Sequence, residues 1–212
     1  MDTTDALSSA ALGMRRQSDR LDVIAENLAN ASTVGYRTRR SVAQAFDGRL
    51  RSEIVASDAQ GPLRRTDVPT DLALVGPGFF AVQTTGGVTH TRDGRLSVDR
   101  DGFLCDSAGN KVLGSLGPAR FPRGAHVNPD GKIIANGRVV DRLRIVFPHG
   151  AGFERAQAIV RSGFLEDSGV DPIAEMTELV ASERAYEANQ KTAQQADESL
   201  RRAVTDVPAV RS

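Results

Sequence analysis

The residue types that serve in metal sites are present in this chain, but not at the spacing that such sites need. Asp99, Asp101 and Gly102 resemble the opening of a calcium loop, yet the glutamate that should close the loop is missing. The three histidines lie far apart in the sequence, with no pair at ligand spacing. An aspartate followed by glycine is also a common hairpin turn, so we predict a turn here and no metal site.

Motifs for catalysis or nucleotide binding are also missing. Gly76-Pro77-Gly78 is too short to cradle a phosphate, and neither glycine-rich nucleotide motif occurs. No nucleophile elbow is present, although a Ser-His-Asp triad assembled only by the fold stays open. Cys105 is the single cysteine and cannot form an internal disulfide. We therefore predict that the chain is not an enzyme and takes no cofactor and no small-molecule substrate.

Composition and charge exclude further classes. The 212 residues are 40% hydrophobic and 25% charged, which is typical of globular proteins. Lysine plus arginine equals aspartate plus glutamate at 27 each, so the basic excess of a nucleic-acid binder is missing. No run approaches the length of a membrane span. Residues 1–30 lack a basic start followed by an apolar block, so we expect no cleavable secretory signal.

The two ends of the chain are predicted to be helices with matching periodicity. Both show spacings of alternately four and three residues, which is the 3.5-residue period of a coiled-coil seam. The first seam, in a helix of roughly residues 5–30, is Leu7, Ala11, Met14, Ser18, Leu21, Ala25 and Leu28. The second is Met176, Leu179, Glu183, Tyr186, Gln190, Ala193, Asp197, Leu200 and Val204. Such seams need partners, so the pattern indicates assembly.

Opposite charges on the two helices favour their pairing. The N-terminal region carries an arginine cluster, and the C-terminal helix carries a row of glutamates, which suits complementary helix faces better than a nucleic-acid groove. The arginines are Arg15, Arg16, Arg20, Arg37, Arg39 and Arg40, and the glutamates are Glu175, Glu178, Glu183 and Glu187.

The middle of the chain is predicted to be a small antiparallel β domain. Glycine and aspartate cut it into short apolar runs, with turn signals every eight to twelve residues. We expect its core to contain Leu74, Phe79, Phe80, Val82, Leu96, Val98, Ile145 and Phe147. The predicted fold class is thus α+β. Residues 1–40 and 165–205 form the paired helices, 60–160 the β domain and 206–212 a flexible tail. Residues 41–59 connect them as a short helix or an extended arm.

Three motifs, in order, give the chain a family resemblance. They are residues 21–37 (LDVIAENLANASTVGYR), residues 71–82 (DLALVGPGFFAV) with 91–94 (TRDG) and 101–104 (DGFL), and residues 162–171 (SGFLEDSGVD) with 175–176 (EM) and 183–189 (ERAYEAN). Together they resemble the bacterial flagellar basal-body rod and hook proteins over most of residues 7–200. The closest likeness is to the distal rod protein in a shortened form, with the proximal rod or a generic hook–basal-body protein left open.

The resemblance implies a structural subunit of the flagellar rod, which polymerises into a hollow axial shaft that transmits torque to the hook. The paired helices would form its axial core. Implied partners are copies of itself, other rod and hook proteins, and the flagellar export apparatus. The implied location is the basal body, outside the cytoplasmic membrane, after export without a cleaved signal peptide. The alternative is a secreted surface or cell-wall binding module that does not polymerise.

Departures from the family pattern mark this chain. Glu26 stands where asparagine is usual, and Gly169 replaces another common asparagine.

Assembly residues are expected on both helices and at the end of the first. They are Leu7, Ala11, Met14, Leu21, Asn27, Leu28, Asn30, Thr33, Gly35, Tyr36, Met176, Leu179, Arg184, Tyr186, Asn189 and Leu200. Of these, we expect Asn27, Asn30, Thr33, Gly35 and Tyr36 to serve assembly rather than folding of the β body.

Overall fold

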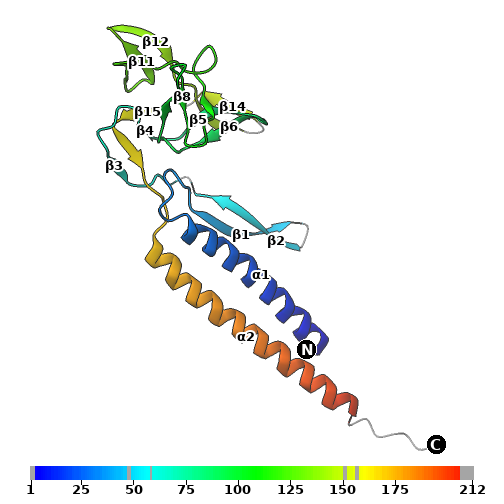
Figure 1. Ribbon diagram of the computed structural model, residues 1–212. Coiled ribbons are helices and arrows are strands. Elements are labelled where there is room, and N and C mark those ends of the chain that lie inside the picture. The colour runs from blue at the N-terminus through cyan, green and yellow to red at the C-terminus, as the bar shows by residue number, and fades with distance from the viewer. Residues whose placement is uncertain (1–2, 47–48, 58, 150–151, 156–157, 206–212) are drawn as a thin grey trace, which may run out of the picture. The chain divides into compact units, whose positions relative to one another are not determined.

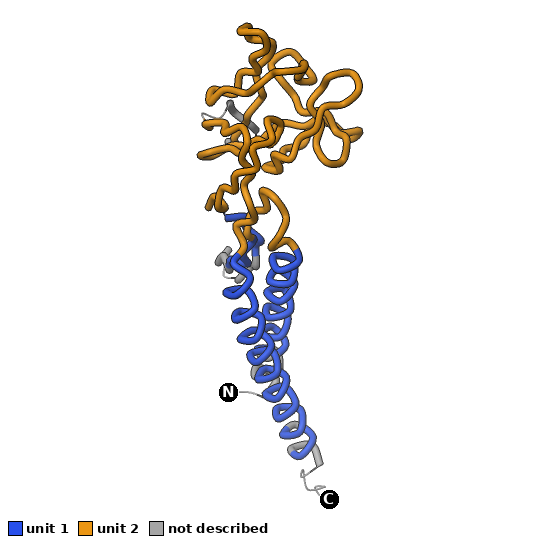
Figure 2. The backbone as a smooth tube through the Cα atoms, turned by 60° about the vertical axis from the view of Figure 1, so that its left-hand side comes forward, with its two compact units in different colours: residues 1–29, 39–57, 171–212 blue, residues 30–38, 58–170 orange. Residues whose placement is uncertain are grey.

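The protein, seen as a computed structural model, divides into two compact units (Figure 1, Figure 2). The first unit contains residues 1–29, 39–57 and 171–212, and the second contains residues 30–38 and 58–170. The described residues are 3–46, 49–57, 59–149, 152–155 and 158–205. Two helices and many antiparallel strands make the chain an α+β protein, which confirms the predicted class at this level. No helix within these ranges has the length and hydropathy needed to cross a membrane.

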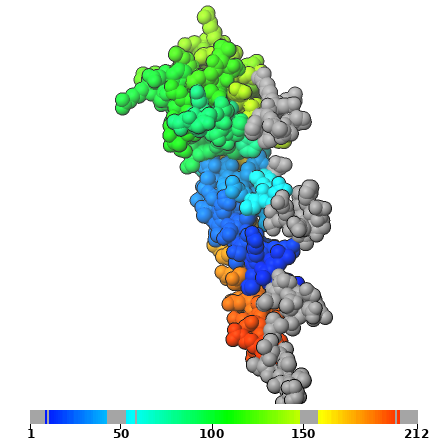
Figure 3. All heavy atoms as spheres, turned by 90° about the vertical axis from the view of Figure 1, so that its right-hand side faces the viewer, coloured from blue at the N-terminus to red at the C-terminus, as the bar shows by residue number. Residues whose placement is uncertain are grey.

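Two long helices and a hairpin make up the first unit. Helix α1 (Thr3–Ala29) and helix α2 (Pro172–Thr205) lie along each other (Figure 1, Figure 3). Asp171 begins α2: its Oδ1 accepts hydrogen bonds from the backbone N–H groups of Ile173 and Ala174, at 3.0 and 3.3 Å. Proline follows at the first helical position, where its missing N–H costs nothing.

The contacts between α1 and α2 show the relative direction of the two helices. Gly13 lies under Asn189: a Cβ built on Gly13 would be 3.0 Å from Asn189 Nδ2. Further along α1, Arg20 forms an ion pair with Glu178, which lies nearer the start of α2. The helices are therefore antiparallel in this unit. Whether they pack as a coiled coil stays a prediction.

Part of the predicted seam is exposed, and buried or half-buried residues lie next to these exposed positions. Ser182 is buried and Asn189 half-buried, whereas the predicted positions Glu183 and Gln190 are exposed. On α1, Ala11, Ser18 and Ala25 are also exposed, while Ile24 and Asn27 are buried. Small residues such as Gly13 and Ser182 allow a close approach of the two backbones. The helices therefore contact each other through faces that differ in part from those predicted from the larger side chains.

Residues 41–59 are mostly a hairpin, which the sequence analysis did not predict. Strand β1 (Arg39–Phe46) pairs antiparallel with strand β2 (Arg49–Ala56), and each has eight residues. The β-branched residues are Val42 in β1 and Ile54 and Val55 in β2, and such residues are typical of strands. The segment therefore belongs to the first unit as regular structure rather than as a connecting arm.

Every strand pair among the described residues of the second unit is antiparallel. Its largest sheet has seven strands, in the order β14-β13-β5-β9-β8-β7, with β6 also pairing with β5. A three-stranded sheet (β10-β11-β12) and two pairs (β15-β4 and β16-β3) complete it. The strands are β3 (Leu63–Arg65), β4 (Leu72–Val75), β5 (Phe79–Thr84), β6 (Gly87–Thr91), β7 (Ser97–Val98), β8 (Leu104–Cys105), β9 (Lys111–Val112), β10 (His126–Val127), β11 (Lys132–Ala135), β12 (Arg138–Arg142), β13 (Ile145–His149), β14 (Gly152–Arg155), β15 (Ile159–Ser162) and β16 (Phe164–Glu166).

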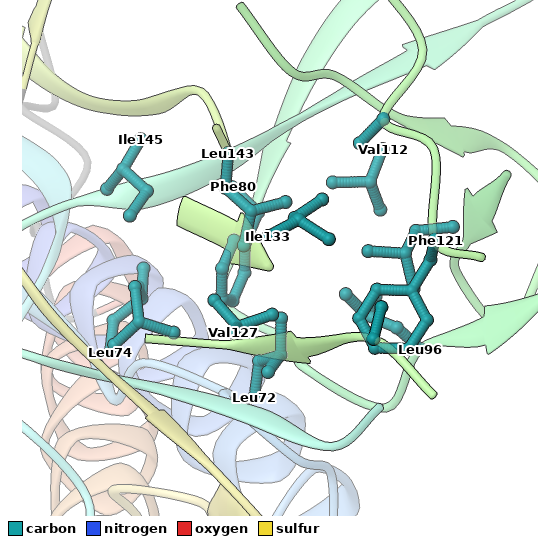
Figure 4. Close-up of a cluster of buried hydrophobic side chains, with 14 of the residues drawn as sticks. Leu72, Leu74, Phe80, Leu96, Val112, Phe121, Val127, Ile133, Leu143 and Ile145 are labelled. Carbon is teal, nitrogen blue, oxygen red and sulfur yellow. The ribbon is translucent and has the colours of Figure 1, made fainter. Parts of the chain in front are cut away.

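The core of the second unit gathers around Phe80, which is fully buried among Val127, Ile133 and Leu143 (Figure 4). Five of the predicted core residues are buried: Leu74, Phe80, Val82, Leu96 and Ile145. The predictions for Val98 and Phe147 are wrong, and of Phe79 and Phe80, which were expected to point to opposite faces of one strand, Phe80 is the buried one. Val98 and Phe147 are 41% and 36% exposed, and Phe79 is only half-buried. Val98 lies on the two-residue edge strand β7, and Phe79 points to the opposite face of β5 from Phe80.

Aspartates at the turns act as hydrogen-bond acceptors. Asp99 Oδ1 accepts from the N–H groups of Asp101 and Phe103 at 2.9 and 2.8 Å, which is the turn predicted from the Asp-Gly pair. These backbone bonds are the main cause that lowers the pKa of Asp99.

Within the described ranges, no group of three or more His, Cys, Asp or Glu side chains is placed to hold a metal ion.

The two neighbouring phenylalanines of β5 should differ in their effect on stability. Phe80→Ala removes a fully buried ring, so it should lower the free energy of unfolding by about 3–5 kcal/mol. Phe79→Ala should lower it clearly less because that residue is only half-buried. Urea unfolding followed by circular dichroism measures both. Equal small losses in the two variants would contradict this assignment of the core.

Candidate functional site

A buried ion pair lies in the second unit. Arg92 Nε donates to Glu166 Oε2 at 2.8 Å, and the two side chains are only 1% and 2% exposed. Arg92 follows the end of β6, and Glu166 is the last residue of β16. An isolated charge at such depth would be very costly, so each of these groups depends on its partner.

Arg92 also binds the backbone that turns from β4 into β5. Its Nη2 donates to the carbonyl oxygens of Leu74 and Gly76, at 3.2 and 2.8 Å, and its Nη1 donates to that of Gly78. The Gly76-Pro77-Gly78 stretch thus presents carbonyl oxygens to a guanidinium, the reverse of a phosphate cradle, which presents N–H groups. On the other side of the pair, Glu166 Oε1 accepts from the N–H of Gly61 at 3.2 Å.

Burial and charge act on Arg92 in opposite directions. Burial lowers the pKa of Arg92 and is the largest cause, while the attraction of Glu166 raises it. A guanidinium keeps its proton in proteins, so Arg92 stays charged in this site. The hydrogen bonds from Arg92 to the three carbonyls then satisfy the donors that Glu166 leaves free.

Gly35 packs directly against the backbone of Arg92. Its φ is +68°, and a Cβ at this position would lie 2.5 Å from the carbonyl carbon of Arg92. Its N–H donates to the backbone oxygen of Glu166 at 2.7 Å. The expectation that Gly35 has no part in folding the β body is therefore wrong, because only glycine fits here. A role of Gly35 in assembly stays a prediction.

The ion pair joins the three motifs of the sequence. Gly35 belongs to the first motif, Gly76, Gly78 and Arg92 to the second, and Glu166 to the third. The first and third are also linked nearby, where Thr38 Oγ1 donates to the oxygen of Gly169 at 2.6 Å, and the N–H of Gly169 donates to the oxygen of Tyr36 at 3.0 Å. Segments far apart in the sequence are thus held at one place within the second unit.

Asn27 is the corresponding buried polar residue of the first unit. Its side chain is 2% exposed, and it both donates to the oxygen of Arg39 and accepts from the N–H of Arg39, at 2.8 and 2.9 Å. Its Nδ2 also donates to Glu175 Oε1 at 3.1 Å. Asn27 therefore connects α1, β1 and α2.

The other predicted assembly residues are spread over both units. In the first unit, Met14, Leu21, Leu28, Leu179 and Asn189 are half-buried, whereas Ala11, Met176, Arg184 and Tyr186 are exposed. In the second, Asn30, Thr33 and Tyr36 are half-buried, and Thr33 Oγ1 bonds Asn30 Oδ1 at 3.1 Å. The side chains of Leu7 and Leu200 lie outside the described residues.

Three family profiles match the chain in the order of its motifs. The profile described as "Flagella basal body rod protein" matches residues 7–37. That of the "Flagellar hook protein FlgE/F/G D1 domain" matches residues 73–150. That of the "Flagellar basal body rod FlgEFG protein C-terminal" matches residues 161–206.

Flagellar rod proteins of other bacteria are similar to this chain over nearly the whole length of both proteins. The chain is 31% identical to the flagellar basal-body rod protein FlgF of Mesorhizobium japonicum, over 91% of this chain and 94% of the relative. It is 32% identical to FlgF of Caulobacter vibrioides, over 92% and 94%. It is 27% identical to the rod protein FlgG of Bacillus subtilis, over 94% and 97%. The chain belongs to the family of flagellar basal-body rod proteins, as the resemblance indicated.

Sequence reasoning placed Arg92 and Glu166 inside the motifs but gave neither a role. The missing information was topological, because the two residues are 74 positions apart. The same motifs contain other charged residues, among them Asp93 and Asp167, so no signal singled out this pair. Charged residues are almost never fully buried unless they are paired.

Removing one partner of the ion pair should destabilise the second unit strongly. Arg92→Met or Glu166→Met leaves an unpaired buried charge, so each should lower the free energy of unfolding by about 3–5 kcal/mol. The double variant should lose less than the sum of the two. Urea unfolding of all four proteins measures the coupling. Arg64→Met, which breaks the exposed pair with Asp167, is the control and should cost at most about 1 kcal/mol. Additive losses in the double variant would contradict the account.

The substitution Gly35→Ala should destabilise the second unit more than a matched glycine substitution does. Gly102→Ala is the control, because Gly102 has a φ of +81° and open space where the Cβ would lie. The control should cost about 1–3 kcal/mol from backbone strain alone. Gly35→Ala should cost more because the methyl group also collides with the Arg92 backbone. Thermal melting compares the two, and equal melting temperatures would rule out the close packing.

Proposed function

We propose that this chain is a structural subunit of the bacterial flagellar basal-body rod and polymerises into its axial shaft. The observation that carries the proposal is the relation to rod proteins over more than nine-tenths of the chain and of the relatives. The partners are further copies and other rod and hook proteins, and the location is the basal body. Export through the flagellar apparatus without a cleaved signal remains an expectation from the resemblance.

The surface of the first unit supports an assembling helical core. Ile173, Met176 and Val180 of α2 are 77%, 53% and 47% exposed, and Leu12 of α1 is 51% exposed. Exposed apolar side chains in a row on one helix are typical of an interaction surface. In our proposal the paired helices form a coiled-coil-like stem that packs against neighbours, and the β domain lies outside the shaft. The division of the chain into a helical stem and a β domain is part of this proposal.

An alternative is a secreted binding module that does not polymerise. Such a module would use the β domain and would have no need for an apolar helix face. The names of the relatives do not state a position in the rod, so the likeness to the distal rod protein stays a prediction as well.

Genetic complementation separates the two functions. A strain without this gene should not swim, and the wild-type chain should restore swimming. A Met176→Asp, Val180→Asp variant should not restore it because the charges disrupt the apolar helix face. Val139→Asp, at a 58% exposed residue of the second unit, is the control and should restore it. A deletion strain that swims normally would reject the rod function.

A further inference from the structure

A charged cleft lies within the first unit, between α1, α2 and β1. Its volume is about 610 Å³. Both of its walls carry ionic side chains, with arginines in excess over glutamates. The ionic residues of its lining are Arg16, Arg20, Arg39, Arg40, Glu175 and Glu178.

Part of this charge is already neutralised. Arg20 pairs with Glu178, and Arg39 pairs with Glu26 at 2.7 Å. Among the described contacts, Arg16 and Arg40 form no ion pair. Arg16, Arg40 and the carboxylate of Glu175 are left in the lining, so the cleft keeps a net positive charge, which suits carboxylates from outside.

A matching acidic surface is present on the same chain. On α2, Ile173, Met176, Val180, Glu183 and Glu187 follow one another at spacings of three and four residues, so they form one stripe along the helix. All five are exposed. Along the helix, the three apolar residues of the stripe come before its two glutamates. Within the part of the chain that the structure describes, neither glutamate forms an ion pair.

The stripe and the cleft occupy different faces of α2. The cleft takes its α2 residues from Ala174, Glu175 and Glu178, whereas the stripe lies round the helix from these. A contact between stripe and cleft must therefore join two molecules, with each molecule offering a different surface. Such heterologous contacts leave one free surface at each end and build open helical polymers unless a ring closes.

We propose that the cleft of one copy receives Glu183 and Glu187 of a second copy, an inference that rests on the proposed rod function. The carboxylates pair with Arg16 and Arg40, and the apolar half of the stripe packs beside the cleft. Charge complementarity of this kind fixes the register of a contact and selects the partner. It also fits a chain whose formal net charge is zero although its charges are segregated.

Charge reversal with rescue tests the pairing in a strain lacking the gene. Arg16→Glu with Arg40→Glu should abolish swimming, and so should Glu183→Arg with Glu187→Arg. The chain that carries all four changes should swim again, because the charges are exchanged and not lost. Arg15→Glu and Glu198→Arg are controls: both residues are exposed on the same helices, outside the cleft and the stripe, and should leave swimming intact.

Disulfide crosslinking gives a readout that a folding defect does not imitate. Ser41 lines the cleft, so a Ser41→Cys, Glu187→Cys chain in basal bodies should give a ladder of covalent multimers under oxidation. Each single variant should give no ladder, and the native Cys105 is buried. Failure of the fourfold variant to swim, or a double-cysteine chain without a ladder, would overturn the inference. If the deletion strain itself swims, the rod function fails instead.

Discussion

The guanidinium of Arg92 lies where water cannot reach it, so its N–H groups must find oxygen atoms of the protein. One binds Glu166, and others bind the carbonyl oxygens of the turn between β4 and β5. This requirement fixes the path of three separate stretches of chain. It also explains why Gly35 has no side chain, since its backbone lies against that of Arg92. The second unit is thus organised around a polar centre beside its apolar core.

In the first unit, small and polar residues contribute to the contact between the helices, beside the buried Val23 and Ile24 of α1. Gly13 approaches Asn189 closely, and Asn27 bonds both to the hairpin and to α2. Larger apolar side chains of α2 remain on the outside. A helix pair that buries little apolar surface by itself gains stability from tertiary packing with neighbours. This arrangement suits a subunit whose helices complete their burial on assembly.

The sequence predicted what depends on local pattern. Helical periodicity located both long helices, and the Asp-Gly and Gly-Gly turns located the antiparallel body with Phe80 in its core. The helical periodicity did not predict which face of each helix is buried, because packing decides between neighbouring faces. Ser182 is buried, for example, and not the predicted Glu183. It also failed for β1 and β2, whose pairing needs a register that composition does not encode. The Arg92–Glu166 pair could not be derived, because its partners meet only through the topology of the second unit.

Amide hydrogen exchange of the unmodified protein tests most directly whether the ion pair makes the three motifs one cooperative unit. The N–H groups of Gly35 and Gly61 both donate to Glu166, and those of β5 lie in the main sheet. If the pair holds these segments together, their amides should exchange through a common opening with one free energy. Fast exchange of Gly35 and Gly61 while β5 stays protected would show that the motifs open independently, and it would contradict the account.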